Sequence, residues 1–359
     1  MFKVEPQFAA ADEFNDGLAL VEVGAPGNTM EGYIDRAGVF AINPKYEDAR
    51  SFSEGLAAVN VPKGEESNWG FIDRSGKIVI EPQFGDTEGF KNGLAVVLVG
   101  GLGKGRYGVI DRTGKFVINP QYAYLYALGK DRFAYQSDPQ DTRFGILDGR
   151  GRVIADPQFD FLSGAADGLT IAALGSGNAR RCGFVSADGK FVITPQFLMC
   201  KGFNEGLAAV VFDRDGTRGW GYVDTSGRLV IDTPYPAANS FHGGLAAVAV
   251  GDNKENAKWG FIDKRGAMVI APQFDEVLDF RDGRAIVRVG GGYGDQGMSE
   301  VMNRFSKEAN VIFGKWGAID KAGRYVVNPR FDRIDTASDG RAPVRISDHA
   351  NGKSGFVQL

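Results

Sequence analysis

Hydrophobic and polar positions along the chain fall into short blocks instead of helix-like stripes. The runs Phe71–Ile72, Ile78–Ile80 and Leu94–Val97 are apolar at every position, and residues typical of turns separate them. A half-exposed strand would alternate apolar and polar residues, so these runs predict strands covered on both faces. Three such strands per unit, with no helical pattern between them, predict small antiparallel sheets stacked face to face.

One phrase returns throughout the chain. WGFIDRSGKIVIEPQF begins at Trp69, and each related copy has glycine as its second residue. The other copies begin at Glu31, Tyr107, Phe144, Cys182, Trp220, Trp259 and Trp316. Their glycines are 37 to 39 positions apart, except for one interval of 57 between Gly260 and Gly317. Such a period indicates a repeat architecture, so we expect one repeat domain over residues 1–359.

The two ends of the chain look like halves of one more repeat. The chain begins with MFKVEPQF, which matches the second half of a unit, and it ends with SGFVQL, which matches the first half. Pairing of both ends in a shared sheet would also cover faces that an open solenoid leaves to capping repeats. We therefore predict an all-β, closed, propeller-like toroid of about nine small antiparallel blades, with an open β-solenoid or superhelix as the alternative.

The recurrent aspartates suit turns. Asp73 precedes Gly76 by three residues between two apolar runs, a spacing typical of a type I turn whose Asp side chain accepts backbone amides. Equivalent residues are Asp35, Asp111, Asp148, Asp224, Asp263 and Asp320. We interpret them as turn residues and not as catalytic or metal-binding carboxylates. The glycine of FSEGLA, Gly55, is expected to supply a positive φ.

These phrases resemble the WG repeat family of bacterial β-repeat proteins. The Trp-Gly pair itself stands at Trp69, Trp220, Trp259 and Trp316, and the resemblance covers essentially the whole chain. The tryptophan position departs from the pattern at Glu31, Tyr107, Phe144, Cys182 and Ser354. The resemblance implies a scaffold module that accompanies many activities, so it predicts the architecture better than the molecular function. We expect the tryptophans to be core residues.

Composition removes several classes of function. The 41 basic and 45 acidic residues give a net charge of −4, which lacks the basic footprint of a nucleic-acid binder. No apolar run is long enough for membrane insertion. With two histidines and two cysteines, we expect no metal, no cofactor and no catalytic residues, hence no enzyme. Cys182 and Cys200 are expected to be free thiols, with a disulfide as the alternative, and His242 and His349 to lie on the surface.

Two segments stand out as candidates for binding a partner. The insertion 288–315 breaks the period, and apolar residues at helical spacing within it predict a helix near 298–313. The stretch after Gln121 carries more tyrosines than the repeat requires. The predicted partner-binding residues are Tyr293, Met298, Met302, Arg304, Phe305, Ile312, Tyr124 and Tyr126. The alternative is that both segments only pack against neighbouring blades.

We therefore expect a non-catalytic interaction module or scaffold that binds another protein through its loops. A toxin-neutralising (immunity) or regulatory role would suit such a module. The alternative is a carbohydrate or cell-envelope binder that uses exposed aromatics, and an enzyme using carboxylates alone is a third hypothesis. Because MFKVEPQF is already repeat sequence, no leader is evident, so we expect a cytoplasmic protein. The alternative is an exported, periplasmic protein whose leader has been removed.

Overall fold

A computed structural model describes ten ranges of the chain. They are residues 2–25, 27–61, 68–101, 103–129, 131–214, 216–252, 257–290, 314–335, 340–346 and 353–359. The described residues form antiparallel strands and a single turn of 3₁₀ helix, η1 (Gly177–Ala179). Most of the insertion 288–315, with its predicted helix, lies outside the described residues.

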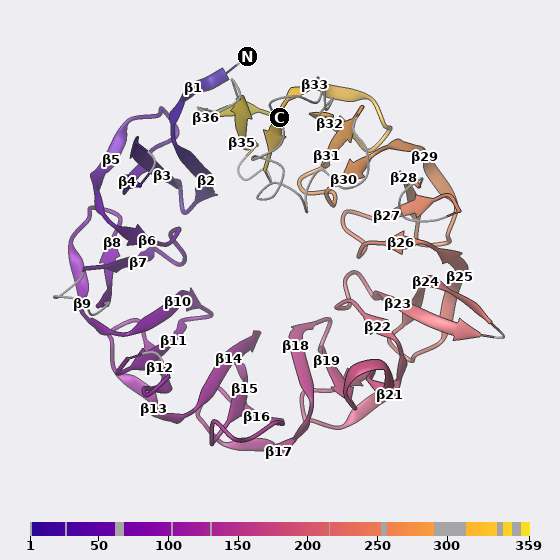
Figure 1. Cartoon of the computed structure of the whole chain (residues 1–359), viewed down its shortest axis with the longest axis horizontal. Coiled ribbons are helices and arrows are strands. Elements are labelled where there is room, and N and C mark those ends of the chain that lie inside the picture. Colours follow the sequence, from indigo (N-terminus) through magenta and orange to yellow (C-terminus); the bar gives the residue numbers. More distant parts are fainter. Residues whose placement is uncertain are drawn as a thin grey trace. The chain divides into compact units, whose positions relative to one another are not determined.

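Contacts divide the chain into two compact units. The first unit comprises Phe2–Pro195 and Lys353–Gly355, and the second comprises Gln196–Gly352 and Phe356–Leu359. Figure 1 labels the strands of both units.

In the first unit, four-stranded sheets follow one another along the chain. They are β2 (Ala10–Asn15), β3 (Leu18–Ala25), β4 (Asn28–Ile34) and β5 (Phe40–Tyr46); β6 (Asp48–Ala49), β7 (Leu56–Asn60), β8 (Trp69–Asp73) and β9 (Ile78–Phe84); β10 (Asp86–Lys91), β11 (Leu94–Val99), β12 (Arg106–Asp111) and β13 (Phe116–Tyr122); β14 (Tyr124–Gly129), β15 (Arg132–Gln136), β16 (Phe144–Asp148) and β17 (Val153–Phe159); and β18 (Phe161–Ala166), β19 (Leu169–Leu174), β20 (Arg181–Val185) and β21 (Phe191–Phe197), the last of which reaches the unit boundary.

The second unit continues in the same way. Its sheets are β22 (Met199–Cys200), β23 (Leu207–Arg214), β24 (Thr217–Asp224) and β25 (Leu229–Tyr235); β26 (Ala237–Ala238), β27 (Leu245–Val250), β28 (Lys258–Asp263) and β29 (Met268–Phe274); and β30 (Glu276–Val277), β31 (Arg284–Val289), β32 (Lys315–Asp320) and β33 (Tyr325–Phe331). The strands β34 (Arg333–Ile334), β35 (Arg341–Ile346) and β36 (Lys353–Gln358) complete the chain.

Each sheet is a blade with the same register. In one blade Asn60 of β7 faces Trp69 of β8, and Trp69 faces Phe84 of β9. Nine four-stranded antiparallel sheets of this kind make the fold an all-β propeller, as the sequence predicts.

One sheet contains strands from both ends of the chain. The ninth sheet has the order β1-β36-β35-β34, with β1 (Phe2–Phe8) beside the C-terminal strand β36. Gly355 on β36 has the same surroundings as Gly70, which belongs to a repeat that is continuous in sequence. A Cβ on Gly70 would lie 2.6 Å from the carbonyl oxygen of Ile80, and one on Gly355 would lie 2.6 Å from that of Val4. The repeated glycine is therefore required by the close approach of two backbones.

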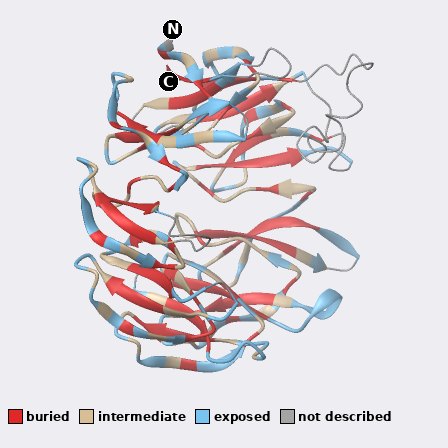
Figure 2. Ribbon diagram, turned by 60° about the vertical axis from the view of Figure 1, so that its left-hand side comes forward, coloured by how far each residue is buried: buried red, intermediate tan, exposed pale blue. Residues whose placement is uncertain are grey.

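Side chains of consecutive blades build the core between the sheets. Tyr33 and Phe52 meet edge to face with centroids 4.8 Å apart, and Phe71 and Phe90 lie at the same separation. Trp69 is 4% exposed, and Trp220 and Trp316 are also buried, as a core role predicts. Figure 2 shows buried residues running along the strands.

One expectation about the strands is wrong. Ile78 and Val79, in a run predicted to be covered on both faces, are 41% and 46% exposed. They lie on β9, the last strand in the order of its blade, where no further strand follows in the sheet. A run of apolar residues therefore does not show whether a strand lies at the edge of its sheet, as β9 does, or is buried, as β7 and β8 are.

Candidate functional site

The structure places two of the predicted binding residues, Tyr124 and Tyr126, on β14. The other six, Tyr293, Met298, Met302, Arg304, Phe305 and Ile312, lie outside the described residues. Tyr124 is 51% exposed, whereas Tyr126 is partly buried and its hydroxyl donates to the carbonyl of Leu162 at 2.9 Å. Burial raises the pKa of Tyr126 to about 12. Tyr126 thus packs against the following blade while Tyr124 faces outward.

Tyr124 lies where the blade β10–β13 meets the blade β14–β17, which we call the β10–β14 junction. The ring of Tyr126 lies against Phe144 of its own blade. Preceding junctions of the first unit carry an aromatic pair whose members are 19 positions apart, such as Tyr33 and Phe52. Val109 and Leu128 occupy the equivalent positions here. In the structure, Val109 packs with Phe133 and Tyr135 at this junction, whereas Leu128 packs at the following one, in a cluster with Leu162.

The turns at this junction differ as well. Elsewhere in the first unit, a turn carboxylate accepts the glycine amide of the next turn, from Gly55 to Asp16 at 2.7 Å and from Gly93 to Glu54 at 2.8 Å. At the β10–β14 junction the turn residue is Asn92, which has no carboxylate, and Arg132 follows Asp131 in place of glycine. The sequence therefore changes both the residue that would accept this hydrogen bond and the residue whose amide would donate it.

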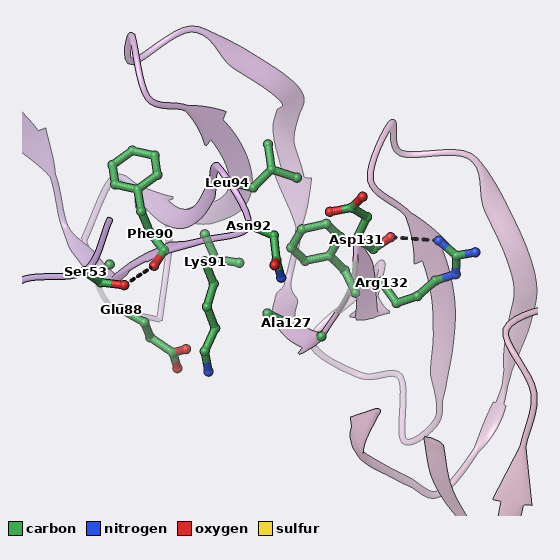
Figure 3. A pocket seen from close by; sticks show the side chains of 13 residues that line it. Ser53, Glu88, Phe90, Lys91, Asn92, Leu94, Ala127, Asp131 and Arg132 are labelled. Atoms are coloured by element: carbon green, nitrogen blue, oxygen red, sulfur yellow. Dashed lines mark hydrogen bonds between the residues drawn. The ribbon is translucent and has the colours of Figure 1, made fainter. Parts of the chain in front are cut away.

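Two cavities open at the β10–β14 junction. The first cavity has a volume of about 130 Å³ and lies near the turns that carry Asn92 and Asp131. Figure 3 shows it between Ser53, Lys91 and Arg132, with the Ser53 hydroxyl donating to the carbonyl of Phe90. Its lining mixes acidic, basic and apolar side chains.

The second cavity measures about 200 Å³ and lies at the opposite end of β10. It is lined by Asp86, Thr87, Glu88, Val96, Tyr107, Tyr124, Leu125 and Tyr126. Burial, followed by the charges of Asp86, Tyr124 and Glu88, raises the pKa of Tyr107. Tyr107, Tyr124 and two carboxylates therefore share one small space, whereas the ring of Tyr126 is turned toward the following blade. Glu88 and Val96 line both cavities.

The repeated aspartates act as turn residues, as predicted. Asp73 Oδ1 accepts the amides of Ser75 at 2.9 Å and Lys77 at 3.1 Å. Asp263 accepts the amides of Arg265 and Ala267 in the same way. The hydrogen bond from the backbone of Ala267 and the Arg265 side chain lower the pKa of Asp263. These carboxylates are thus occupied by their own turns.

Sequence reasoning missed the acidic residues that precede the turn glycines. Gly55 has a φ of 80°, as expected, but Glu54 before it also has a positive φ of 55°. Glu205 repeats the arrangement in the second unit and accepts the amide of Gly244 at 3.0 Å. The recurrence of Asp, Glu or Asn before these glycines was the available signal.

Both cysteines, Cys182 and Cys200, are disulfide-bonded, so the expectation of free thiols is wrong. The repeat frame explains why. Cys182 stands at the tryptophan position and Cys200 follows it by 18 residues. In the first unit, Glu31 stands at the tryptophan position and its carboxylate accepts the amide of Ala49, 18 residues later. Within the first unit, these two repeat positions therefore meet in space.

Glu31 is the most perturbed carboxylate in the first unit. Burial raises its pKa to about 7 against the opposing hydrogen bond from Ala49, and nearby Asp48, Glu22 and Asp12 raise it further. Glu31 lines neither cavity of the β10–β14 junction. Its raised pKa therefore affects the stability of a contact between two blades.

His242 takes part in polar contacts with two neighbouring side chains. His242 Nε2 lies 2.7 Å from Asn204 Nδ2, and His242 Nδ1 lies 3.5 Å from Asp279 Oδ2. In the part of the chain that the structure describes, no group of three or more His, Cys, Asp and Glu side chains is arranged to hold a metal ion. His349 lies outside the described residues.

A family model described as the WG containing repeat matches seven segments. They are residues 32–61, 69–102, 107–138, 183–214, 220–253, 259–293 and 316–348. The chain belongs to this family. The sequence has no match among curated proteins.

Solved structures resemble this WG repeat protein in fold. One of a eukaryotic initiation factor covers 92% of this chain and 93% of its own, with a TM-score of 0.56 and 13% identity. The β-propeller domain of the Trilobed protease from Pyrococcus furiosus covers 75% of this chain and 97% of its own, with a TM-score of 0.38 and 7% identity. At these identities the likeness concerns the fold alone.

Proposed function

We propose that this WG repeat protein is a non-catalytic interaction module that binds a partner protein at the β10–β14 junction. The observation that carries the proposal is the exposed Tyr124 beside the second cavity, which is lined by further tyrosines and by carboxylates. Tyrosine contributes large contact area at low entropic cost and is enriched among residues that dominate binding energy. A toxin-neutralising or regulatory role would be one form of such binding.

The carbohydrate-binding alternative has less support. It requires grouped exposed aromatic platforms, whereas Trp69, Trp220 and Trp316 are buried between blades and the exposed rings of Tyr124 and Tyr325 belong to different units. The aspartates that an enzyme could use are held by their own turns, as at Asp73 and Asp263. Both observations favour binding of a protein over binding or cleavage of a sugar.

Affinity capture from a lysate of the native host tests the proposal. Wild type is compared with Tyr124→Ser and with Tyr325→Ser, which removes another exposed tyrosine, 42% exposed, from the second unit. We expect a protein that wild type and Tyr325→Ser retain and Tyr124→Ser loses. A partner retained equally by all three variants would place the interaction elsewhere.

The insertion 288–315 remains a second proposed binding element, on sequence grounds. Replacing residues 290–313 with a short Gly-Ser turn should preserve folding and weaken capture of the same partner. Full capture by this variant would remove the insertion from the proposal.

We further propose an oxidising compartment for this protein. None of the helices in the described ranges has the length and apolar content needed to cross a bilayer. The disulfide-bonded state of Cys182 and Cys200 favours an exported, periplasmic location over the cytoplasmic one, because cytosolic thiols are normally kept reduced. Alkylation of native cells before lysis should leave both cysteines unlabelled, and labelled cysteines would support a cytoplasmic protein.

A further inference from the structure

Two blades share a basic side chain that precedes the repeat tryptophan and covers its ring, and in a third blade Arg288 covers Trp316 from a different position. The Arg50 guanidinium lies 4.9 Å from the centre of the Trp69 ring, and the Lys201 amine lies 5.4 Å from that of Trp220. In both cases the cation precedes the aromatic residue by 19 positions. Each unit thus contains one example of the same cation–π contact.

The following blade holds each of these cations from the other side. Arg50 forms an ion pair with Asp86 at 3.2 Å, and Lys201 donates to Asn239 Oδ1 at 2.8 Å. These two blades therefore share a cation position, with an aromatic face on one side and a polar side chain of the next blade on the other.

The β10–β14 junction has the same aromatic position with a carboxylate in place of the cation. Tyr107 faces Tyr122 in the register in which Trp69 faces Phe84. The residue 19 positions before Tyr107 is Glu88, which is exposed. The second cavity opens between these two residues and β14.

The following blade is altered here too. Tyr124 stands 38 positions after Asp86 and therefore at the position of the residue that pairs with Arg50. Tyr126 stands 38 positions after Glu88. The second cavity thus presents Tyr107, Tyr124 and the Glu88 carboxylate at a position where two other blades place a cation of their own.

We propose that the second cavity binds a cationic side chain, arginine or lysine, of the partner protein. The partner supplies from outside the charge that Arg50 and Lys201 supply within the chain. This inference rests on the proposed function and names the chemistry of its contact. Tyrosine faces attract cations, and a carboxylate strengthens a hydrogen bond from a charged donor.

The neighbouring charges agree with this assignment. Asp86, which also lines the second cavity, is paired with Arg50, so Glu88 is the carboxylate that would meet an incoming cation. Lys91 lines the first cavity and is absent from the lining of the second. The same two carboxylates contribute to the raised pKa of Tyr107, which shows that their field reaches the cavity.

Titration with short blocked peptides tests the inference. One peptide carries arginine, and the other carries citrulline, which has nearly the same shape without the charge. Binding is followed through the tyrosine signals in nuclear magnetic resonance spectra. We expect the arginine peptide to bind at millimolar concentration, about fivefold or more tighter than the citrulline peptide.

Three variants locate the binding. Glu88→Arg supplies the repeat's own cation and should abolish peptide binding, whereas Glu88→Gln removes the charge with little change in shape and should weaken it about fivefold. Glu81→Gln, which removes an exposed carboxylate from β9, is the control and should bind as wild type. Thermal unfolding confirms that each variant is folded, and Glu88→Gln keeps the test decisive if Glu88→Arg does not fold.

Equal affinity for the two peptides, no binding of the arginine peptide at millimolar concentration, or undiminished binding by Glu88→Gln would overturn the inference. The proposed function fails on a different observation. If Tyr124→Ser loses the captured partner while the peptides bind equally, the interaction module stands and only its cation specificity is wrong.

Discussion

Replacing Glu31 with glutamine should make the stability of this WG repeat protein less dependent on pH. Glu31 is half-buried at the tryptophan position, and its carboxylate accepts the amide of Ala49. Burial raises its pKa to about 7 from 4.5, so the folded state holds this proton more tightly than the unfolded state. Glutamine has the shape of the protonated acid and keeps an acceptor for Ala49, but it cannot ionise.

The sign and size of the effect follow from proton linkage. A carboxyl group with a raised pKa loses stability as pH rises from 4.5 through about 7, because the folded state must then give up its proton at a cost. One pKa unit corresponds to about 1.4 kcal/mol, so the full shift amounts to about 3 kcal/mol. Partial exposure of Glu31 reduces this through solvent screening, and we expect about 1–3 kcal/mol at pH 8.

Urea unfolding at pH 5 and at pH 8 provides the measurement. The difference in free energy of unfolding between Glu31→Gln and wild type should be small at pH 5 and should favour the variant at pH 8. Fluorescence of the buried tryptophans reports unfolding of the core.

Glu81→Gln serves as the control, because it removes an exposed carboxylate that lies outside any blade contact of Glu31. Its difference from wild type should be the same at both pH values. If Glu31→Gln also differs from wild type by the same amount at pH 5 and pH 8, Glu31 ionises without cost in the folded protein and the reasoning is refuted.

Three further predictions concern the repeat frame. Gly70→Ala should lower the free energy of unfolding by about 1–3 kcal/mol in urea titrations, whereas Gly101→Ala, in open space, should change it by less than about 0.5 kcal/mol. Asp263→Asn should reduce the loss of stability below pH 4, since a lowered carboxyl pKa stabilises the fold only while the group stays ionised. Reduction of the disulfide should lower stability by about 3 kcal/mol, the loop-closure value for cysteines about 18 residues apart, and a Cys182→Ala, Cys200→Ala double variant should not respond to reductant.

The sequence predicts the repeat frame well because each of its residues has a local cause. Asp73 forms its turn with residues two and four positions away, and Gly70 is fixed by the strand that follows in the same blade. The split repeat predicted at the chain ends follows from the same local pattern, and β1 lies beside β36 in one sheet.

The candidate site is less accessible to such reasoning, because it depends on contacts between blades. The excess of tyrosines near Tyr124 was visible in the sequence, but the sequence does not show that Glu88, which stands where two other repeats carry a cation, lies beside Tyr107 and Tyr124. Only alignment of the repeats on the structure shows that these positions meet. The disulfide was missed for the same reason, because its two positions lie in consecutive repeats.

The bonds between turns have a consequence for how such a chain can change its length. Asp16 accepts the amide of Gly55, Glu54 accepts that of Gly93, and each acceptor and its donor are 39 residues apart. A repeat with this pair of residues therefore brings one acceptor for the unit after it and one donor for the unit before it. A gene duplication that copies a whole period would carry both groups in frame, so added or deleted repeats would find matching neighbours without compensating mutations. Recombination within a repeat would instead separate the acceptor from its donor, which favours evolution by whole units.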